Sequence, residues 1–157
     1  MQNLKNSKMK EFSAEIKATF EREIALNRAK NCQHIFQHSQ AKQIIKHIKQ
    51  NYDSEPEFLW LKFPSYAVFR HSENKKWYAV LMAINARKLG LKNDEVVNVI
   101  NIKAEPKSII NLVYNKRYFK AYHMNKKHWL SILLDENAEF KAVCELIAIS
   151  YEMTRKK

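Results

Sequence analysis

Glycine is almost absent from this chain, which has one in 157 residues, Gly90, together with only three prolines. A single glycine excludes the glycine-rich loops that wrap phosphates, and the patterns GxGxxG, GxxxxGK[ST], GxSxG and HExxH are also missing. The carboxylates are scattered, with no spacing that indicates a paired general acid and base. We therefore expect a protein that is not an enzyme and that has no cofactor.

Cysteine is scarce as well, since Cys32 and Cys144 lie far apart and form no CxxC pair. This spacing excludes the usual cysteine-rich metal sites and is typical of free thiols in a reducing compartment. His34 and His38 lie four residues apart and could share one face of a helix. Because no third ligand is evident, we expect a polar surface pair there and no metal site.

Long apolar runs are missing too, and the longest, such as Ala79 to Ile84, are far too short to cross a bilayer. Residues 1–10 are basic and polar, with no apolar segment behind them, which differs from a secretory signal. We therefore expect a cytoplasmic protein with no membrane partner.

Positive charge is what the chain has in excess, with 28 Lys and Arg against 16 Asp and Glu and a net charge of +12. A charge of this size favours association with nucleic acid, acidic lipid or an acidic protein. The length suits one ordinary domain, and a hydrophobic fraction of 46% is enough for a packed core.

The first third of the chain has a helical pattern. Residues from about 8 to 31 contain neither Pro nor Gly, and they place apolar side chains four apart at Phe12, Ile16, Phe20 and Ile24. A second helix follows Ser39, a good N-cap, with apolar positions at a 3.6-residue period as far as Tyr52. The sequence Ser54-Glu55-Pro56-Glu57 predicts a capping box that opens a short helical turn through Trp60.

The rest of the chain mixes aromatic or β-branched runs with helical segments. We predict strands at 66–71, 77–84, 96–103, 119–124 and 128–134, and helices at 106–114 and 138–153. This order indicates an α+β fold with a mostly antiparallel sheet of about five strands and helices packed on it. Residues 1–40 are predicted as an N-terminal helical extension and residues 41–157 as the α+β domain.

Charge is concentrated between Pro106 and Leu134, where 29 residues contain no Asp or Glu and carry a charge of +6. Aromatic and histidine side chains interleave with these cations, so the segment could neutralise phosphates, stack on bases and donate hydrogen bonds. The tip at Asn125-Lys126-Lys127 would project from a hairpin like a wing, and Lys75-Lys76 marks a second basic tip. The alternative is that the cations are solvated turn residues and the aromatics belong to the core.

The run Tyr122-His123-Met124-Asn125-Lys126-Lys127-His128-Trp129 resembles the YHMNKxHW signature of the bacterial MmcQ/YjbR family. Further segments resemble that family in the same order, at 55–60, 63–70, 75–79, 102–106 and 146–151. The resemblance covers about residues 41–153 and implies a frataxin-like (CyaY-like) fold with DNA binding through a double-wing motif. The chain departs from the pattern at 71–74, where the family often has glycines, and the first forty residues lie outside it.

Composition and resemblance together predict a DNA-binding protein, with transcriptional regulation as one setting. The residues predicted to contact nucleic acid are Arg70, Lys75, Lys76, Lys116, Arg117, Lys120, Tyr122, His123, Asn125, Lys126, Lys127 and His128. The alternative is a non-enzymatic interaction module with an acidic protein partner. An iron-handling role, suggested by the fold alone, is disfavoured because hard cations need clustered oxygen ligands.

Overall fold

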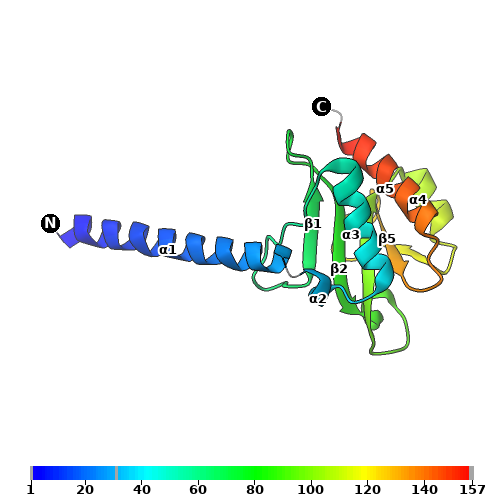
Figure 1. Ribbon diagram of the computed structural model, residues 1–157, viewed down its shortest axis with the longest axis horizontal. Coiled ribbons are helices and arrows are strands. Elements are labelled where there is room, and N and C mark those ends of the chain that lie inside the picture. The colour runs from blue at the N-terminus through cyan, green and yellow to red at the C-terminus, as the bar shows by residue number, and fades with distance from the viewer. Residues whose placement is uncertain (1, 31, 156–157) are drawn as a thin grey trace.

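The computed structural model describes residues 2–30 and 32–155 and shows an α+β fold built on a five-stranded sheet (Figure 1). The strands are β1 (Tyr66–Arg70), β2 (Trp77–Asn85), β3 (Val96–Lys103), β4 (Tyr118–Lys120) and β5 (Trp129–Leu134). Every neighbouring pair is antiparallel, and the strand order is β1-β2-β3-β5-β4. The predicted fold class is therefore confirmed.

Helices lie on one side of this sheet. The helical elements are α1 (Gln2–Lys30), α2 (Cys32–Ile35), α3 (Ser39–Tyr52), the 3-10 helix η1 (Ala86–Leu89), α4 (Pro106–Leu112) and α5 (Phe140–Arg155). Helices α3 and α5 cross the same face of the sheet, whereas α1 extends away from the sheet (Figure 1). Helix α4 connects β3 to β4.

The main core lies between the sheet and helices α3 and α5, and we call this side the helix face. Helix α3 buries Ala41, Ile44 and Ile48 at helical spacing, and α5 buries Val143 and Ile147. The strands contribute side chains of alternate residues, which point to the same side of a sheet. Those that lie fully buried in this core are Ala67, Phe69, Ala79, Leu81, Ile100, Ile102, Leu130, Ile132 and Leu134.

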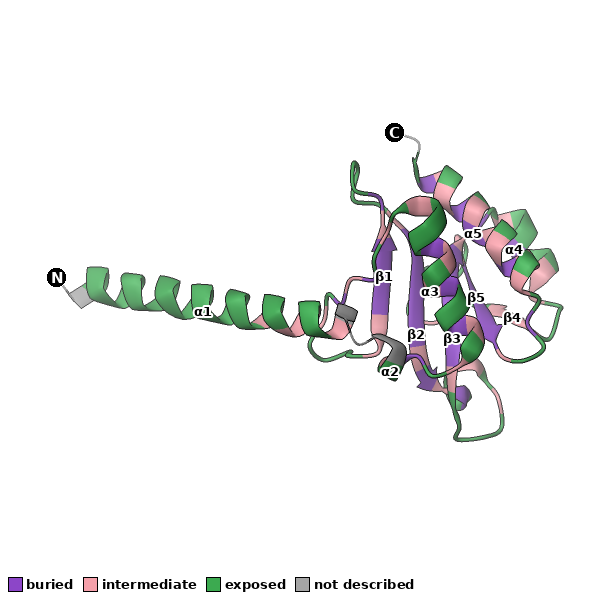
Figure 2. Ribbon diagram, viewed as in Figure 1, coloured by how far each residue is buried: buried purple, intermediate pink, exposed green. Residues whose placement is uncertain are grey.

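The opposite side of the sheet has its own smaller apolar cluster, and we call it the open face. Its buried residues are Val68, Val80, Met82, Ile84, Val99 and Leu133. No described helix crosses this face, and the side chains packed on the cluster come largely from loops and strand ends, among them Trp60, Tyr66, Trp77 and Tyr122. Burial of the strands on both sides is visible in Figure 2.

A β-bulge decides which aromatic side chain lies on which face. Phe69 pairs with Ala79, but Arg70 pairs with Trp77, so Tyr78 is an extra residue in β2. Tyr78 therefore joins Ala79 in the helix-face core, and Trp77 packs on the open face. Bulges of this kind change the direction of a side chain at the end of a ladder.

The segment from Ser54 to Trp60 was predicted as a helical turn, and that prediction is wrong. It runs extended beside β1, where the backbone of Glu57 and that of Val68 exchange two hydrogen bonds of 2.9 and 2.8 Å. Pro56 and Phe58 are buried in this arrangement. Tertiary pairing with β1 therefore outweighs the local capping signal.

Other boundaries also differ from the prediction, by one to six residues, and two of them have a visible cause. The N-cap of α3 is His38, whose Nδ1 accepts a hydrogen bond from Gln40 N at 3.2 Å, and Ser39 is the first helical residue. Strand β4 ends at Lys120, four residues before the predicted Met124. By contrast, β3 has the predicted bounds, Val96–Lys103.

Candidate functional site

The signature segment that follows β4 is held against the open face by buried polar side chains. Asn101 on β3 donates from Nδ2 to the Tyr122 carbonyl at 2.8 Å, and Ser131 Oγ on β5 accepts from Tyr122 N at 3.0 Å. Ser131 Oγ also donates to Asn101 Oδ1 at 2.5 Å, and both side chains are fully buried. Both backbone polar groups of Tyr122 are thus bound by side chains, which explains why the β4 ladder stops here.

His123 adopts the left-handed conformation, with φ of 59°. Residues other than Gly adopt this region uncommonly, and His is among those that do so more often than most. His123 follows the anchored Tyr122, and its imidazole lies 6.1 Å from the Phe63 ring and 6.0 Å from the Tyr66 ring. The loop therefore crosses the open face toward β1.

Six rings gather on the open face, and we call them the aromatic belt: Trp60, Phe63, Tyr66, Trp77, Tyr122 and His123. Phe63 stacks on Tyr66 at 4.9 Å between ring centroids, and Trp60 meets Trp77 edge to face at 5.5 Å. Burial raises the pKa of the Tyr66 phenol, and a hydrogen bond with the Tyr122 side chain raises it further, so Tyr66 stays neutral.

The belt is partly accessible, which distinguishes it from a closed core. Phe63 is 42% exposed and His123 is exposed, whereas Trp60, Tyr66, Trp77 and Tyr122 are half-buried. A hollow of about 350 Å³ adjoins it, between the C-terminal half of α1 and residues 58–63. Exposed rings held by a rigid sheet can stack on planar ligands such as nucleobases.

The two predicted basic tips leave the same end of the sheet. Strands β1 and β4 are parallel in this antiparallel order, so the turn after β1 and the loop after β4 emerge at one end, near opposite edges. Lys75 and Lys76 are exposed in the first, and Lys126 and Lys127 in the second.

The second tip is a short turn built on Asn125. Asn125 Oδ1 accepts from Lys127 N at 2.9 Å, and its carbonyl accepts from His128 N and Trp129 N at 3.2 and 2.9 Å. Asn125 thereby shapes the turn that presents Lys126 and Lys127, and His128 is half-buried behind it.

Two predicted contacts are cations already engaged in ion pairs. Arg70 makes a two-point contact with the Glu57 carboxylate at 2.9 and 2.7 Å, and Arg117 pairs with Asp135. Such charges are largely neutralised by their partners. Lys116 and Lys120 are exposed near the β4 edge of the sheet, away from the turn after β1.

Several belt residues were not predicted from the sequence. Trp60, Phe63, Tyr66 and Trp77 precede the acid-free segment, so a search by charge passed over them. The polar Asn101 and Ser131, each inside an apolar strand, were a signal for a buried anchor.

A second hollow, of about 390 Å³, lies where α3, α5 and the turn after β1 meet. Its lining includes Tyr52, His71, Tyr78 and Tyr151, whose rings pack 4.3 to 5.9 Å apart. Burial raises the pKa of Tyr78 and lowers the pKa of His71, and His71 Nε2 lies 2.8 Å from Thr154 Oγ1.

The described residues contain no group of three or more His, Cys, Asp or Glu placed to hold a metal ion. None of the described helices is both long enough and apolar enough to span a membrane.

Comparisons with known proteins agree with this architecture. Residues 50–153 match the family model YjbR. Uncharacterized protein YyaQ of Bacillus subtilis (strain 168) is 36% identical over 112 residues, which is 71% of this chain and 95% of that protein. A crystal structure of a Pseudomonas syringae protein superposes with a TM-score of 0.71 at 44% identity, covering 73% of this chain and 97% of that chain.

A more distant structure shares the fold alone. Protein DR2400 of Deinococcus radiodurans, described with a DUF419 domain, has a TM-score of 0.50 at 23% identity and covers 66% of this chain and 70% of that chain. A solution structure from Pseudomonas syringae has a TM-score of 0.66 at 43% identity, with coverages of 74% and 93%. At least a quarter of this chain thus has no counterpart in these relatives, and the family match places most of it before residue 50.

Proposed function

The chain belongs to the YjbR family, and we propose that it binds DNA through the loop end of the open face. In this proposal the exposed lysines of the two tips contact phosphates, and the aromatic belt stacks on bases. Affinity comes mainly from the phosphate contacts, which carry little sequence information, so binding is weakly specific.

The observation that carries the proposal is the joining of two features that are separate in the sequence. The acid-free segment supplies exposed Lys126 and Lys127, and the anchored loop of the same segment sets Tyr122 and His123 among rings from residues 60–77. Cations beside accessible rings are the combination that binds single-stranded nucleic acid.

The position of the belt rings favours binding of unpaired bases over binding of an intact duplex. The rings lie on the surface of the sheet, and bases stacked inside a duplex have no face free to meet them. We therefore expect tighter binding to single-stranded DNA, or to duplex with a distorted region, than to regular duplex.

The test is a binding titration with purified, nuclease-treated protein. Labelled single-stranded DNA, duplex DNA and RNA of equal length are titrated from low to physiological salt. We expect micromolar or tighter binding to single-stranded DNA at physiological salt, with an affinity that falls steeply as salt rises.

A matched pair of variants tests where the contact lies. Lys126→Ala with Lys127→Ala removes two charges from the loop end, whereas Lys88→Ala with Lys92→Ala removes two exposed charges at the opposite end, between β2 and β3. The substitutions at Lys126 and Lys127 should make the slope of log K against log salt shallower by roughly one to two. The substitutions at Lys88 and Lys92 should change that slope by less.

Equal effects of the two pairs would mean generic charge attraction and would contradict the proposed interface. Binding that disappears well below physiological salt would contradict DNA binding itself. A complex with an acidic protein that survives nuclease treatment would then support the interaction-module alternative.

A further inference from the structure

We propose that α1 is a self-association helix, which pairs antiparallel with α1 of a second copy of this chain through Met9, Phe12, Ile16 and Phe20. This inference does not depend on the proposed DNA binding, because α1 lies outside residues 50–153 that match the family model and contributes no residue to the two basic tips or the aromatic belt.

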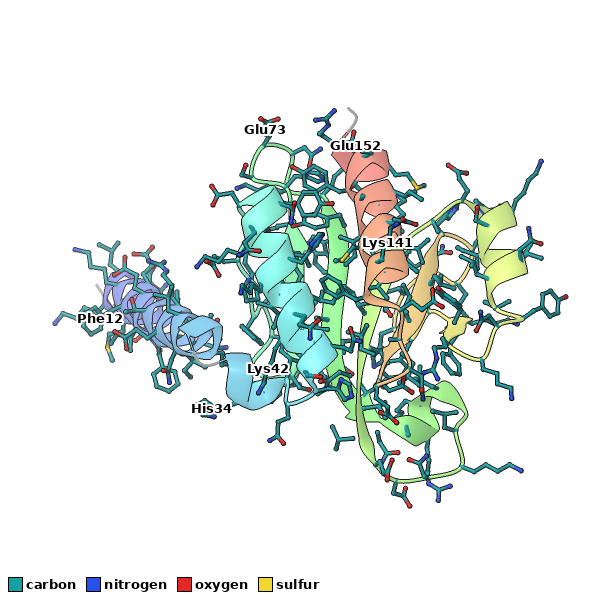
Figure 3. The ribbon with its side chains drawn as sticks, turned by 45° about the vertical axis from the view of Figure 1, so that its right-hand side comes forward. Phe12, His34, Lys42, Glu73, Lys141 and Glu152 are labelled. Carbon is teal, nitrogen blue, oxygen red and sulfur yellow. The ribbon has the colours of Figure 1, made fainter. Side chains whose placement is uncertain are left out.

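The starting observation is an exposed apolar stripe. Met9, Phe12, Ile16 and Phe20 are 71%, 65%, 55% and 60% exposed. At 3.6 residues per turn, these side chains fall within roughly a quarter of the circumference of the helix. Phe12 projects from α1 far from the sheet in Figure 3, and this part of α1 is exposed throughout in Figure 2.

Contact with the domain is limited to the C-terminal part of α1. Arg28 Nη1 donates to the Trp60 carbonyl at 3.2 Å, and Lys17, Glu21 and Ala25 line the hollow beside residues 58–63. An isolated helix is only marginally stable in water, and large exposed apolar side chains grouped together mark an interaction site. The first half of α1 therefore needs a cover that the rest of the described chain does not supply.

The distribution of charge along α1 indicates that a second copy of this chain covers the apolar stripe. Residues 2–10 contain Lys5, Lys8 and Lys10 and no acid, a charge of +3. Residues 11–24 contain four glutamates, one lysine and one arginine, a charge of −2. Parallel helices would place like charges together, whereas an antiparallel pair places each basic end beside the acidic part of its partner.

The apolar stripe is self-complementary in the same arrangement. With the two-fold axis near Ala14, Phe12 faces Ile16 of the second copy, and Met9 faces its Phe20. Lys5 then faces Glu23 of the second copy. Each of these contacts occurs twice in the symmetric dimer, and the two folded domains lie at opposite ends of the helix pair, where they do not collide.

The test measures the mass of the full chain by sedimentation velocity and light scattering, after nuclease treatment so that nucleic acid cannot bridge two copies. We expect a dimer of about 37 kDa, twice the 18.7 kDa chain, that dissociates on dilution. Phe12→Asp with Ile16→Asp should give a monomer. Ala18→Asp, which places the same charge on the opposite side of α1, should leave the dimer intact.

A charge exchange tests the orientation. Lys5→Glu alone and Glu23→Lys alone should each weaken the dimer roughly five-fold, since each pair is present twice, and the double exchange should recover affinity. Unchanged thermal unfolding of the α+β domain in every variant shows that the fold is intact. A chain that stays monomeric at all concentrations, or a dimer insensitive to Phe12→Asp with Ile16→Asp, overturns the proposal. Failure of the double exchange to recover affinity overturns the antiparallel pairing.

Discussion

The two faces of the sheet are built from the same strands but are completed in different ways. The helix face is covered by α3 and α5, whose apolar side chains fill a continuous core with Phe69, Ile100 and Ile132. The open face is covered by loops, and the segment that carries Tyr122 and His123 is held there by hydrogen bonds between the backbone of Tyr122 and the side chains of Asn101 and Ser131. Stability therefore resides mainly in the first face, and a surface able to meet a ligand resides in the second.

The largest expected effect is a loss of stability on truncating a core residue of the helix face. Ile100→Ala removes a fully buried side chain and leaves a cavity, so unfolding free energy should fall by about 3 kcal/mol in denaturant titration. Val96→Ala is the control, because Val96 lies on the same strand at 73% exposure and should change stability by less than about 0.5 kcal/mol. Similar losses for both variants would contradict the assignment of the main core to this face.

The next effect tests the polar anchor of the open face. Asn101→Leu removes the donor to the Tyr122 carbonyl and leaves that acceptor buried, which should cost about 1–3 kcal/mol and speed amide hydrogen exchange after Tyr122. Ser131→Ala should act on the same network, so the double variant should cost less than the sum of the two. Additive costs would show that the two side chains do not act together.

A smaller effect separates ligand binding from folding. Phe63→Ala removes an exposed ring of the aromatic belt and should weaken single-stranded DNA binding by about 1 kcal/mol, roughly five-fold. Its unfolding free energy should change little, since the ring is only partly buried. If stability falls while affinity is unchanged, the belt is a second core and no stacking surface.

The smallest expected effect is a pH dependence of stability that is caused by His71, at the end of the helix face. Burial lowers the pKa of His71 below its ordinary value of 6.5, and the nearby charge of Arg155 lowers it further, outweighing a hydrogen bond with the Tyr151 backbone. The unfolded chain thus binds a proton at a higher pH than the folded chain does. Stability should therefore fall as pH drops below about 6.5 and level off below the folded pKa.

His71→Gln tests this pH dependence by removing the titrating group. Denaturant titrations between pH 5 and 8 should show a flatter profile for the variant than for the original chain. A profile of unchanged slope would assign the pH dependence to other groups.

Local pattern was enough to predict most of the fold. The run of β-branched residues at Val96–Lys103 predicts a strand with the bounds observed, because both of its faces are buried. The turn expected after Ser54 failed because Glu57 pairs with Val68, a contact between segments that no local signal contains. Strand β4 is short for a similar reason, since side chains from β3 and β5 bind the backbone of Tyr122.

The candidate site was only partly predictable from the sequence. The cations at Lys126 and Lys127 were found by counting charge, and the structure places them at an exposed turn. The charges of Arg70 and Arg117 could not be discounted, because their partners Glu57 and Asp135 are brought near by the sheet. The aromatic belt was missed because its rings come from separate segments and meet only in the folded chain.

The bulge in β2 means that two adjacent aromatic residues are subject to different packing constraints. Tyr78 belongs to the core and Trp77 to the aromatic belt, although a regular strand would exchange their directions. The bulge shifts the alternation of side chains by one residue, so a one-residue deletion before Trp77 that restored regular pairing would turn Tyr78 to the open face and Trp77 to the helix face.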